Sequence, residues 1–567
     1  MEKIKIIIDN KELEAKKGQT ILEAAKENGI EIPALCFHPD LNIKANCRIC
    51  LIEIKGKKGL LTACSTKAER GMEVITESPE IRKARKINLE LIFGQHCEEC
   101  GDCVRNHNCR LLDLAQEYGI KSSRFSDRKA EFPCYNFDSA LVYDSSKCID
   151  CRNCVEACAR QNVHYLEVKK NKSFYEVVPS ENPKRDCIYC GQCLVHCPVG
   201  AFEAVGEFED VEKPLQDKNK FVIFQFAPAV RTSIGEEFGM TAGAIVTEKL
   251  VGAIKKLGVN KVFDVSVGAD FTTIEEAKEL IERKPSELPV LSSCCPAWVK
   301  FVEFYHPEFI PNIATTRSPH IFLGSLIKSY FAEKEKLDPK NIVVVSVMPC
   351  VAKKYEVIRD ELRINGLKPV DYVLTTRELA FLLKKKNIDF KTAKEEKPDI
   401  PFGVPSGAGV IYGATGGVME SALRTAYEKI NGRPLKNFNL KEVRGQKAVK
   451  AATLKLGGKK IKVAVVNGLD KIEEILADIR KKPGLYHCVE VMACRGGCVG
   501  GGGQPVPVSD KIRAARAKSL YNIDDKAGVR LAHKNPVVED VYRNFLTSEE
   551  KIKFFCHTKY SKKLKEN

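Results

Sequence analysis

The pattern of hydrophobic and polar positions divides the chain near residue 220. Before that point the periodic runs are short: residues 3–8 alternate as a strand does, and Thr20 precedes a helical stretch that ends at Gly29. Residues 79–94 form a second helical pattern, and cysteine-rich segments lie on both sides of it. This part of the chain predicts several small units, the first of which opens with two strands and a helix.

From about Lys220 onward, apolar strands alternate with helical stretches, a pattern typical of α/β domains with mainly parallel sheets. We expect strands at 221–228, 259–268, 288–293, 341–349 and 460–468, and helices at 241–258 and 274–283. Ligands of such folds gather at the carboxyl ends of strands. Cys294 and Cys295 follow one expected strand and Cys350 follows another, so we expect a site at these ends.

Length and composition indicate a large multidomain protein. The chain has 567 residues, of which 44% are apolar, enough to bury a sizeable core in each of several domains. It has no window of about 20 apolar residues and no secretory pattern at its N-terminus, so we expect a cytoplasmic location. In a reducing compartment, repeated Cys-x2-Cys runs favour metal ligation over disulfides.

The formal net charge of +16 counts every cysteine as neutral. Thiolate-held clusters at the five sites expected below would bring about −9 in total, which cancels much of this basicity. The remaining Lys-rich surface, including the C-terminal KKLKEN, is either a solvated face or a surface that attracts an acidic electron carrier.

Cysteines carry most of the functional signal. Nineteen of the 24 cysteines, together with one histidine, lie at spacings typical of metal ligands. Zinc is the alternative at the first group, but a first gap of ten residues and a small strand-and-helix frame fit zinc ribbons poorly. This group suits a 2Fe-2S cluster and consists of Cys36, Cys47, Cys50 and Cys64.

The second group combines one imidazole with three thiolates: His96, Cys100, Cys103 and Cys109. An imidazole in place of a thiolate removes a negative charge and generally raises the reduction potential of the cluster. Cys97 lies inside this run but off its spacing. We interpret it as a spare thiol, with competition against His96 for the metal as the alternative.

An internal repeat of the bacterial ferredoxin type follows. In this motif the fourth cysteine of each run ligates the cluster of the other run. One 4Fe-4S cubane is therefore expected on Cys148, Cys151, Cys154 and Cys197, and the other on Cys187, Cys190, Cys193 and Cys158.

The last group lies in the segment EVMACRGGCVGGGGQP at 490–505. Cys494 and Cys498 would share one face if this segment were helical, and its glycines would let a bulky cofactor approach the backbone. With SSCCPAW at 292–298 and MPCVAKKYE at 348–356, the segment closely resembles the active-site signatures of iron-iron hydrogenases. The preceding clusters resemble those of the family's long clostridial-type members, so the resemblance covers nearly the whole chain.

This resemblance implies a cofactor and its ligands. The cofactor is an H-cluster, a 4Fe-4S cubane joined to a two-iron subsite that carries CO, cyanide and a bridging azadithiolate. By position, the cubane ligands are Cys295, Cys350, Cys494 and Cys498, and Cys498 also bridges to the subsite.

Four further residues match family positions around the subsite. Cys294 resembles the proton donor to the azadithiolate amine, and Lys353 resembles the lysine that donates a hydrogen bond to a cyanide. Met348 and Met492 resemble the thioethers that pack around the subsite, although core filling is the simpler interpretation of a methionine taken alone.

The resemblance also extends to a proton path. Glu276 and Glu279 match the family's relay carboxylates at positions i and i+3 of an expected helix, and Arg283 follows one turn later. A solvated acidic face is the alternative interpretation of these residues.

Three positions of that path depart from the best-known members of the family. Ala314 stands where they have a serine, with Thr315 and Thr316 beside it. Ala229 stands in place of another serine, and His320 in place of a glutamine. These departures leave the cluster ligands unchanged but put the route of the proton in question.

We therefore expect an α/β multidomain protein with four units. They are a β-grasp 2Fe-2S domain at 1–78, a His-ligated 4Fe-4S domain at 79–125, a bacterial ferredoxin-like 2x(4Fe-4S) domain at 126–210, and a C-terminal α/β H-cluster domain at 211–567 that includes a small-subunit-like segment from about 510.

The implied function is the reversible reduction of protons to H2, with electrons relayed through one 2Fe-2S and three accessory 4Fe-4S clusters. The expected electron donor is ferredoxin or another acidic carrier, with NAD(P)H-oxidising partner subunits as a further possibility. Maturation proteins are expected to deliver the two-iron subsite. Neither nucleic acid nor a membrane is an expected partner. The alternative class is a non-catalytic iron–sulfur subunit or a hydrogenase-like assembly or sensory protein. Cys294, Lys353 and the 494–498 signature argue against that class.

Overall fold

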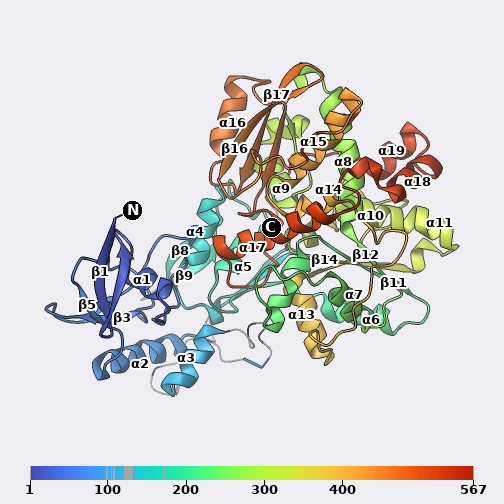
Figure 1. The fold of residues 1–567 in the computed structure, drawn as a ribbon. Coiled ribbons are helices and arrows are strands. Elements are labelled where there is room, and N and C mark those ends of the chain that lie inside the picture. Colours follow the sequence, from blue (N-terminus) through green and yellow to red (C-terminus); the bar gives the residue numbers. More distant parts are fainter. Residues whose placement is uncertain are drawn as a thin grey trace.

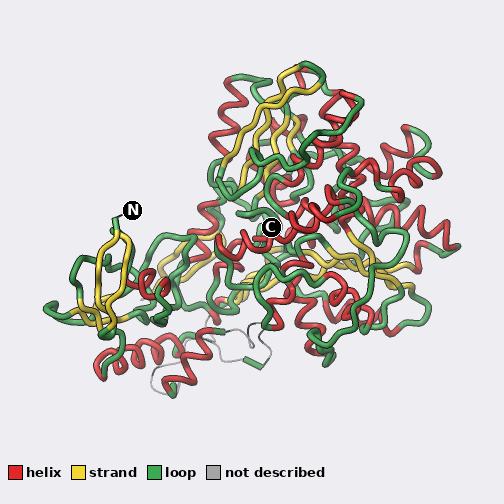
Figure 2. Tube along the Cα trace, viewed as in Figure 1, coloured by secondary structure: helices red, strands yellow, loops and turns green. Residues whose placement is uncertain are grey.

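The computed structural model describes residues 2–96, 100, 101, 103, 105, 109–120, 125, 132–171 and 174–565. Figure 1 shows a small N-terminal sheet at one end of the molecule and two larger sheets, each accompanied by helices, at the other. Figure 2 shows loops running between these parts, in the region that carries most of the cysteines. No helix of the described residues is long and apolar enough to cross a membrane.

The N-terminal sheet has five strands in the order β2-β1-β5-β3-β4, with β1 parallel to β5 and antiparallel to β2. Thr20 caps α1 through a capping box with Glu23, so the predicted opening of two strands and a capped helix is confirmed. The elements are β1 (Lys3–Ile8), β2 (Lys11–Lys16), α1 (Ile21–Glu27), β3 (Leu51–Ile54), β4 (Leu61–Thr62) and β5 (Glu73–Ile75).

The segment between this sheet and residue 210 consists of short helices and strands. The helix predicted at 79–94 is α2, whose N-cap Ser78 accepts a hydrogen bond from the backbone of Ile81. Three strands form a sheet in the order β10-β7-β6, and β8 pairs with β9. The elements are α2 (Pro79–Phe93), α3 (Arg110–Tyr118), β6 (Cys134–Phe137), β7 (Leu141–Asp144), α4 (Asn153–Arg160), β8 (Leu166–Asn171), β9 (Phe174–Pro179), α5 (Gln192–His196), β10 (Phe202–Ala204) and α6 (Phe208–Gln216).

The first large sheet has the order β12-β11-β14-β15, and all of its strand pairs are parallel. This confirms the predicted α/β pattern after residue 220. The strands are β11 (Phe221–Phe226), β12 (Lys261–Asp264), β14 (Ile342–Met348) and β15 (Tyr372–Thr375). The helices of this part are α7 (Thr247–Lys255), α8 (Val265–Glu282), α9 (Pro296–Tyr305), α10 (Pro319–Leu326), α11 (Ala332–Glu335), α12 (Ala352–Glu356) and α13 (Thr376–Lys385).

The second large sheet has the order β13-β18-β17-β16, and only its edge strand β16 is antiparallel to its neighbour. The strands are β13 (Val290–Leu291), β16 (Val449–Leu456), β17 (Lys459–Asn467) and β18 (Cys488–Met492). The remaining helices are α14 (Gly407–Val410), α15 (Gly417–Asn431), α16 (Ile472–Lys481), α17 (Asp510–Lys526), α18 (Pro536–Asn544) and α19 (Glu549–Cys556). In Figure 1, α17 crosses the middle of the molecule, with β16 and β17 above it and β14 below it.

Several element boundaries differ from the prediction, and two of these differences have a clear local cause. The strand expected at 259–268 ends at Asp264, whose side chain accepts a hydrogen bond from the backbone of Ser266 and starts α8. The apolar residues that follow it are buried on every side of the helix, so their run resembles a strand in sequence. The helix expected from 241 begins only at Thr247, because Gly243 adopts a left-handed φ of +82°.

Candidate active site and electron relay

A mostly apolar cavity lies where β14 and β18 end and α9 begins. Cys295 is the N-cap residue of α9, and Cys350 follows β14 by two residues. The structure thus confirms that predicted site residues meet at the carboxyl ends of strands. The residues predicted for the active site that line this cavity are Cys294, Cys295, Cys350, Cys494, Cys498, Met348, Met492 and Lys353, and Ala229 and His320 line it as well.

The segment that carries Cys494 and Cys498 is not the α-helix that their spacing suggested. β18 ends at Met492, a tight turn follows, and Cys498 begins a short 3-10 turn. Gly496 and Gly497 adopt φ values of +86° and +84°, which an α-helix does not contain. The two sulfurs reach the same cavity through this turn.

Glycines let other backbone segments pack closely at the wall of the cavity. A Cβ atom on Gly497 would lie 2.6 Å from the backbone nitrogen of Thr415, and one on Gly501 would lie 2.1 Å from the carbonyl oxygen of Pro349. The five cysteines that line the cavity are mostly shielded from solvent, and burial raises the pKa of Cys295 and Cys498 above the usual range of a thiol. Several thiols around one mostly buried cavity supply the soft ligands that an iron–sulfur cluster takes, so these residues fit the cluster that the sequence suggests.

Lys353 is fixed by two acceptors at the wall of the cavity. Its Nζ donates to the carbonyl oxygen of Cys294 at 3.1 Å and to Glu356 Oε2 at 2.7 Å. Burial alone would raise the pKa of Glu356, but the charge of Lys353 and the hydrogen bond from His320 lower it to about 2. Lys353 is therefore a charged donor beside an ionised carboxylate.

His320 completes this arrangement in a defined tautomer. Its Nε2 lies 2.6 Å from Glu356 Oε2, so this nitrogen carries the hydrogen, and Nδ1 accepts from the hydroxyl of Ser346 at 3.2 Å. Burial and the nearby Lys353 lower the pKa of His320 to about 4, so the ring is neutral near pH 7. The histidine that departs from the family pattern thus supports Glu356, and sequence reasoning missed this role.

Glu276 is a buried carboxyl group on the cavity side of α8. Burial, together with the charges of Glu279 and Glu490, raises its pKa to about 8. Tyr412, which lines the cavity, donates a 3.4 Å hydrogen bond to Glu276 Oε2 and accepts one from Thr273 at 2.9 Å. Burial raises the pKa of the Cys294 thiol well above its usual value, so both groups hold protons near pH 7.

Glu279 lies on the solvent side of the same helix. Its Oε1 accepts hydrogen bonds from the Thr315 hydroxyl at 2.9 Å and the Thr316 hydroxyl at 3.1 Å, and its Oε2 accepts from Arg283 at 3.0 Å. It lines an outer cavity together with the exposed Lys553. Ala314 is fully buried and offers no hydroxyl, so the two threonines supply the hydroxyl contacts to Glu279.

His557 is a second residue that sequence reasoning missed. It belongs to the C-terminal segment, and its Nδ1 lies 2.8 Å from the Thr315 hydroxyl and 3.7 Å from Glu279 Oε1. Its Nε2 lies 3.2 Å from Glu275 Oε2. No local signal marks this histidine, because its partners are more than 200 residues away in the chain.

The four cysteines of the first group gather as two pairs. The backbone nitrogen of Cys47 donates to the Cys36 sulfur at 3.5 Å, and contact between the two side chains shifts their pKa values in opposite directions. Cys50 and Cys64 interact in the same way. Cysteines arranged as two pairs provide two ligands for each iron of the expected 2Fe-2S cluster.

His96 has the orientation of a metal-binding histidine. Its Nδ1 lies 2.8 Å from the carbonyl oxygen of Lys147, so Nδ1 carries the hydrogen and Nε2 carries the lone pair. Cys100, Cys103 and Cys109 are partly buried nearby in the sequence. Cys97, the predicted spare thiol, lies outside the described residues.

The cysteines of the two ferredoxin runs lie close together. Burial is the largest cause of their raised pKa values, and the charge of Cys197 also contributes at Cys151 and Cys154. The charge of Cys158 contributes at Cys187 and Cys193, and that of Cys197 also contributes at Cys193. These contacts place the two runs side by side, and the assignment of each fourth cysteine to the cluster of the other run stays a prediction.

The fold and these sites define a multicluster iron–sulfur oxidoreductase with a buried catalytic cavity. Residues 220–502 match the family described as iron only hydrogenase large subunit, C-terminal domain, and residues 510–563 match iron hydrogenase small subunit. Residues 1–79 match a 2Fe-2S binding domain, residues 85–124 an iron–sulfur binding region of NADH-ubiquinone oxidoreductase G, and residues 147–201 a 4Fe-4S dicluster domain.

The chain belongs to the iron-iron hydrogenases, enzymes that interconvert H2 with protons and electrons. It is 38% identical to the NADP-reducing hydrogenase subunit HndD of Solidesulfovibrio fructosivorans, covering 99% of this chain and 100% of that protein. It is also 38% identical to iron hydrogenase 1 of Clostridium pasteurianum, covering 98% and 100%. A solved structure of a variant of HydA1 from Chlamydomonas reinhardtii is 35% identical, with a TM-score of 0.57 over 63% of this chain and 99% of that one.

Proposed function

We propose that this chain catalyses the reversible reduction of protons to H2 in the cavity between β14 and β18, with Cys295, Cys350, Cys494 and Cys498 holding an H-cluster. The observation that carries this proposal is the convergence of these four cysteines with Cys294, Lys353, Met348 and Met492 on one cavity. When bound, the two-iron subsite supplies the metal at which protons and electrons combine. The protein positions it and separates the two supply routes.

In this proposal Lys353 holds the subsite through its third N–H bond, since the other two are directed at Cys294 and Glu356. Met348 and Met492 pack against it with polarizable thioethers. Cys294 donates the last proton, because its buried thiol is protonated near pH 7 and needs no metal bond.

The proton route would run from the outer cavity to Glu279, then to Glu276 and Cys294. Two observations support this order: Glu279 borders solvent-exposed residues, and Glu276 is buried and protonated below a pH of about 8. Thr315 and Thr316 would compensate for the missing serine at Ala314 by keeping hydroxyls on Glu279.

The electron route would run through four accessory clusters. We propose a 2Fe-2S cluster on Cys36, Cys47, Cys50 and Cys64, supported by the two cysteine pairs, and a 4Fe-4S cluster on His96, Cys100, Cys103 and Cys109, supported by the tautomer of His96. The two remaining 4Fe-4S clusters would lie on the crossed groups of the ferredoxin repeat. We propose domain boundaries to match these clusters: the 2Fe-2S domain ends at residue 78, the His-ligated domain at 125 and the ferredoxin-like domain at 210.

The electron donor in this proposal is a ferredoxin-like acidic carrier or an NAD(P)H-oxidising partner subunit. The partner subunit is supported by the similarity of this chain to a protein named as a subunit of an NADP-reducing hydrogenase. We further propose that maturation proteins deliver the two-iron subsite and that the enzyme works in the cytoplasm.

The proposal is tested on full-length protein made with and without the maturation system. Matured protein should show infrared bands of metal-bound CO and cyanide and should evolve H2 from a reduced donor. Protein made without maturation should contain iron for one binuclear and four cubane clusters, without zinc. Absence of the infrared bands from active, iron-replete protein would contradict the assigned cofactor.

Replacement of His96 by cysteine should lower the reduction potential of the cubane at that site, because it adds a thiolate charge to the cluster. The infrared bands of the H-cluster should not change. The measurement is a redox titration followed by electron paramagnetic resonance. An unaltered potential would show that Cys97 or another group is the ligand.

Replacement of Tyr412 by phenylalanine should shift the pH dependence of H2 production. The Tyr412 hydroxyl stabilises the ionised form of Glu276, so its removal raises the pKa of Glu276 above about 8. Glu276 is protonated below its pKa and loses the proton above it, so the decline of the rate on the alkaline side should move to higher pH. Rates of H2 production measured from pH 6 to 10 check this. If the rate of the variant declines at the same pH as that of the parent protein, Tyr412 does not influence the protonation of Glu276.

A further inference from the structure

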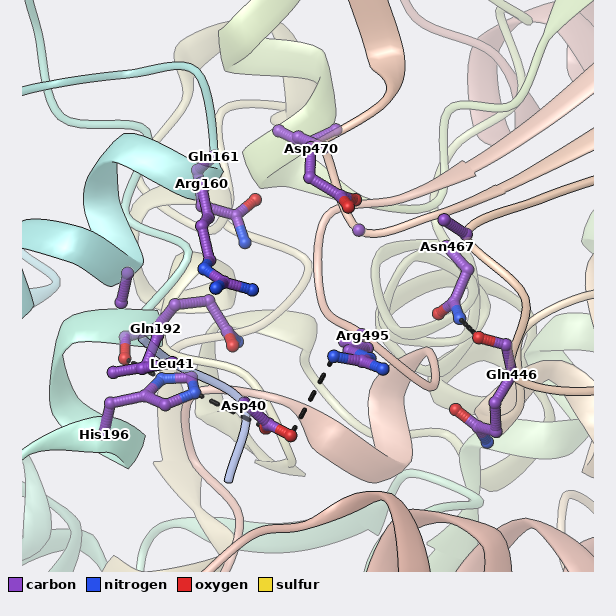
Figure 3. A pocket seen from close by; sticks show the side chains of 14 residues that line it. Asp40, Leu41, Arg160, Gln161, Gln192, His196, Gln446, Asn467, Asp470 and Arg495 are labelled. Atoms are coloured by element: carbon purple, nitrogen blue, oxygen red, sulfur yellow. Dashed lines mark hydrogen bonds and ion pairs between the residues drawn. The ribbon is translucent and has the colours of Figure 1, made fainter. Parts of the chain in front are cut away.

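A second cavity lies between the cysteine-rich part of the chain and the second large sheet. Figure 3 shows Asp40 from the N-terminal part, Gln161 and Gln192 from the ferredoxin repeat, and Asn467 and Arg495 from the catalytic region around it. Three parts of the chain thus meet at one polar cavity. Gln192 belongs to the wall between this cavity and the proposed H-cluster site.

Gln192 makes a direct contact with a proposed ligand of the H-cluster cubane. Its Nε2 lies 3.2 Å from Cys494 Sγ and 3.4 Å from the carbonyl oxygen of Gly500. Both neighbours are acceptors, so the group that faces them is the NH2 end of the amide, which has two hydrogens to donate. Gln192 is 4% exposed, so water does not replace this donor.

The backbone of Gln192 is held by a contact with His196. His196 Nδ1 lies 2.7 Å from the backbone carbonyl of Gln192, and His196 Nε2 lies 3.6 Å from Asp40 Oδ2. Asp40 in turn accepts two hydrogen bonds of 2.7 Å from Arg513 on α17. The backbone at Gln192 is therefore anchored by His196, beside a buried ion pair that joins the first and last parts of the chain.

The loop before Gln192 packs closely against the catalytic region, because glycines on both sides lack side chains. A Cβ atom on Gly191 would lie 2.6 Å from Val351 Cγ2 and 2.8 Å from the Cα atom of Gly502. A Cβ atom on Gly502 would lie 2.8 Å from the carbonyl oxygen of Cys190. The loop that holds Cys190 therefore lies against the loop that holds Cys350, which brings two proposed clusters close together.

We propose that Gln192, supplied by the ferredoxin repeat, tunes the reduction potential of the H-cluster cubane through its hydrogen bond to Cys494. An N–H donor to a ligand sulfur stabilises the more negative, reduced cluster, so it raises the potential. Electrons arriving at the neighbouring cluster are then drawn onto the cubane. Gln192 is a positioning residue in this inference, which rests on the proposed assignment of Cys494 as a cubane ligand.

The test compares matured full-length protein with the variants Gln192→Leu and Gln192→Asn. The infrared bands of CO and cyanide report on the H-cluster alone, so their change during a redox titration gives the potential of its cubane. Loss of the donor should change the equilibrium constant for reducing the cubane about tenfold, which is about 59 mV to more negative potential for a one-electron couple. The potentials of the accessory clusters should remain unchanged.

Gln161→Leu is the matched control. Gln161 is also a buried glutamine that lines the same cavity, and its Oε1 has no hydrogen-bond partner within the described part of the chain. The inference holds if the potential falls in both Gln192 variants and not in this control. It is overturned if iron-replete Gln192 variants keep the parent potential, or if the control shifts equally. Missing infrared bands in the parent protein would instead refute the proposed function.

Discussion

Replacement of Cys294 by alanine is expected to abolish most H2 turnover while the H-cluster remains assembled. Cys294 lines the cavity beside Cys295, but in the proposed assignment four other cysteines hold the cubane. Loss of a positioned general acid typically costs about 10²- to 10⁴-fold in rate. The checks are the rate of H2 evolution, the iron content, and the infrared bands of CO and cyanide in the same preparation.

Cys556→Ala provides a matched control for this variant, because Cys556 is also a buried thiol and lies at no ligand spacing. It should retain the parent rate and the parent spectrum. If Cys294→Ala lost the cluster, Cys294 would be a ligand or a structural thiol. Near-parent turnover with intact bands would exclude it from proton transfer.

Replacement of Glu279 by glutamine is expected to slow turnover strongly, by about 10²-fold or more, with the H-cluster unchanged. Glutamine keeps the size of the side chain and can accept from Thr315 and Thr316, but it cannot take up and release a proton near neutral pH. The measurement is the rate of H2 production and of H2 oxidation, since a blocked proton route slows both directions.

Glu282→Gln is the control for Glu279, because Glu282 is exposed near the end of the same helix. It removes the same charge at a site accessible to water and should leave the rate near that of the parent. Equal rates for Glu279→Gln and the parent would show that protons reach Glu276 by another route, for which the contact between Tyr412 and Glu276 is the first candidate.

The sequence predicted the cysteines of the cavity well because each lies in a short motif whose position follows from a strand end. β14 places Cys350, and the first turn of α9 places Cys295, as the α/β pattern required. The segment with Cys494 and Cys498 was predicted less well. Spacing alone suggested a helix, whereas the left-handed glycines at 496 and 497 form a turn.

The residues that support the site were beyond the reach of sequence reasoning. Gln192 contacts Cys494 across 302 positions, and His320 contacts Glu356 across 36. A glutamine inside a ferredoxin motif or a tyrosine inside a glycine-rich stretch has no local pattern that marks it as part of an active site. Only the packing of distant segments reveals such contacts, and these are the contacts that set protonation and redox properties.

The ion pair between Asp40 and Arg513 constrains how the chain matures. Its two partners are separated by 473 positions, so a ribosome must synthesise nearly the whole protein before this pair can form. The N-terminal sheet can form earlier during synthesis, since it needs only residues 3–75. Its attachment to the catalytic region is completed last, when α17 has emerged. A prematurely ended chain therefore carries cluster-binding modules that lack this connection to the site they serve.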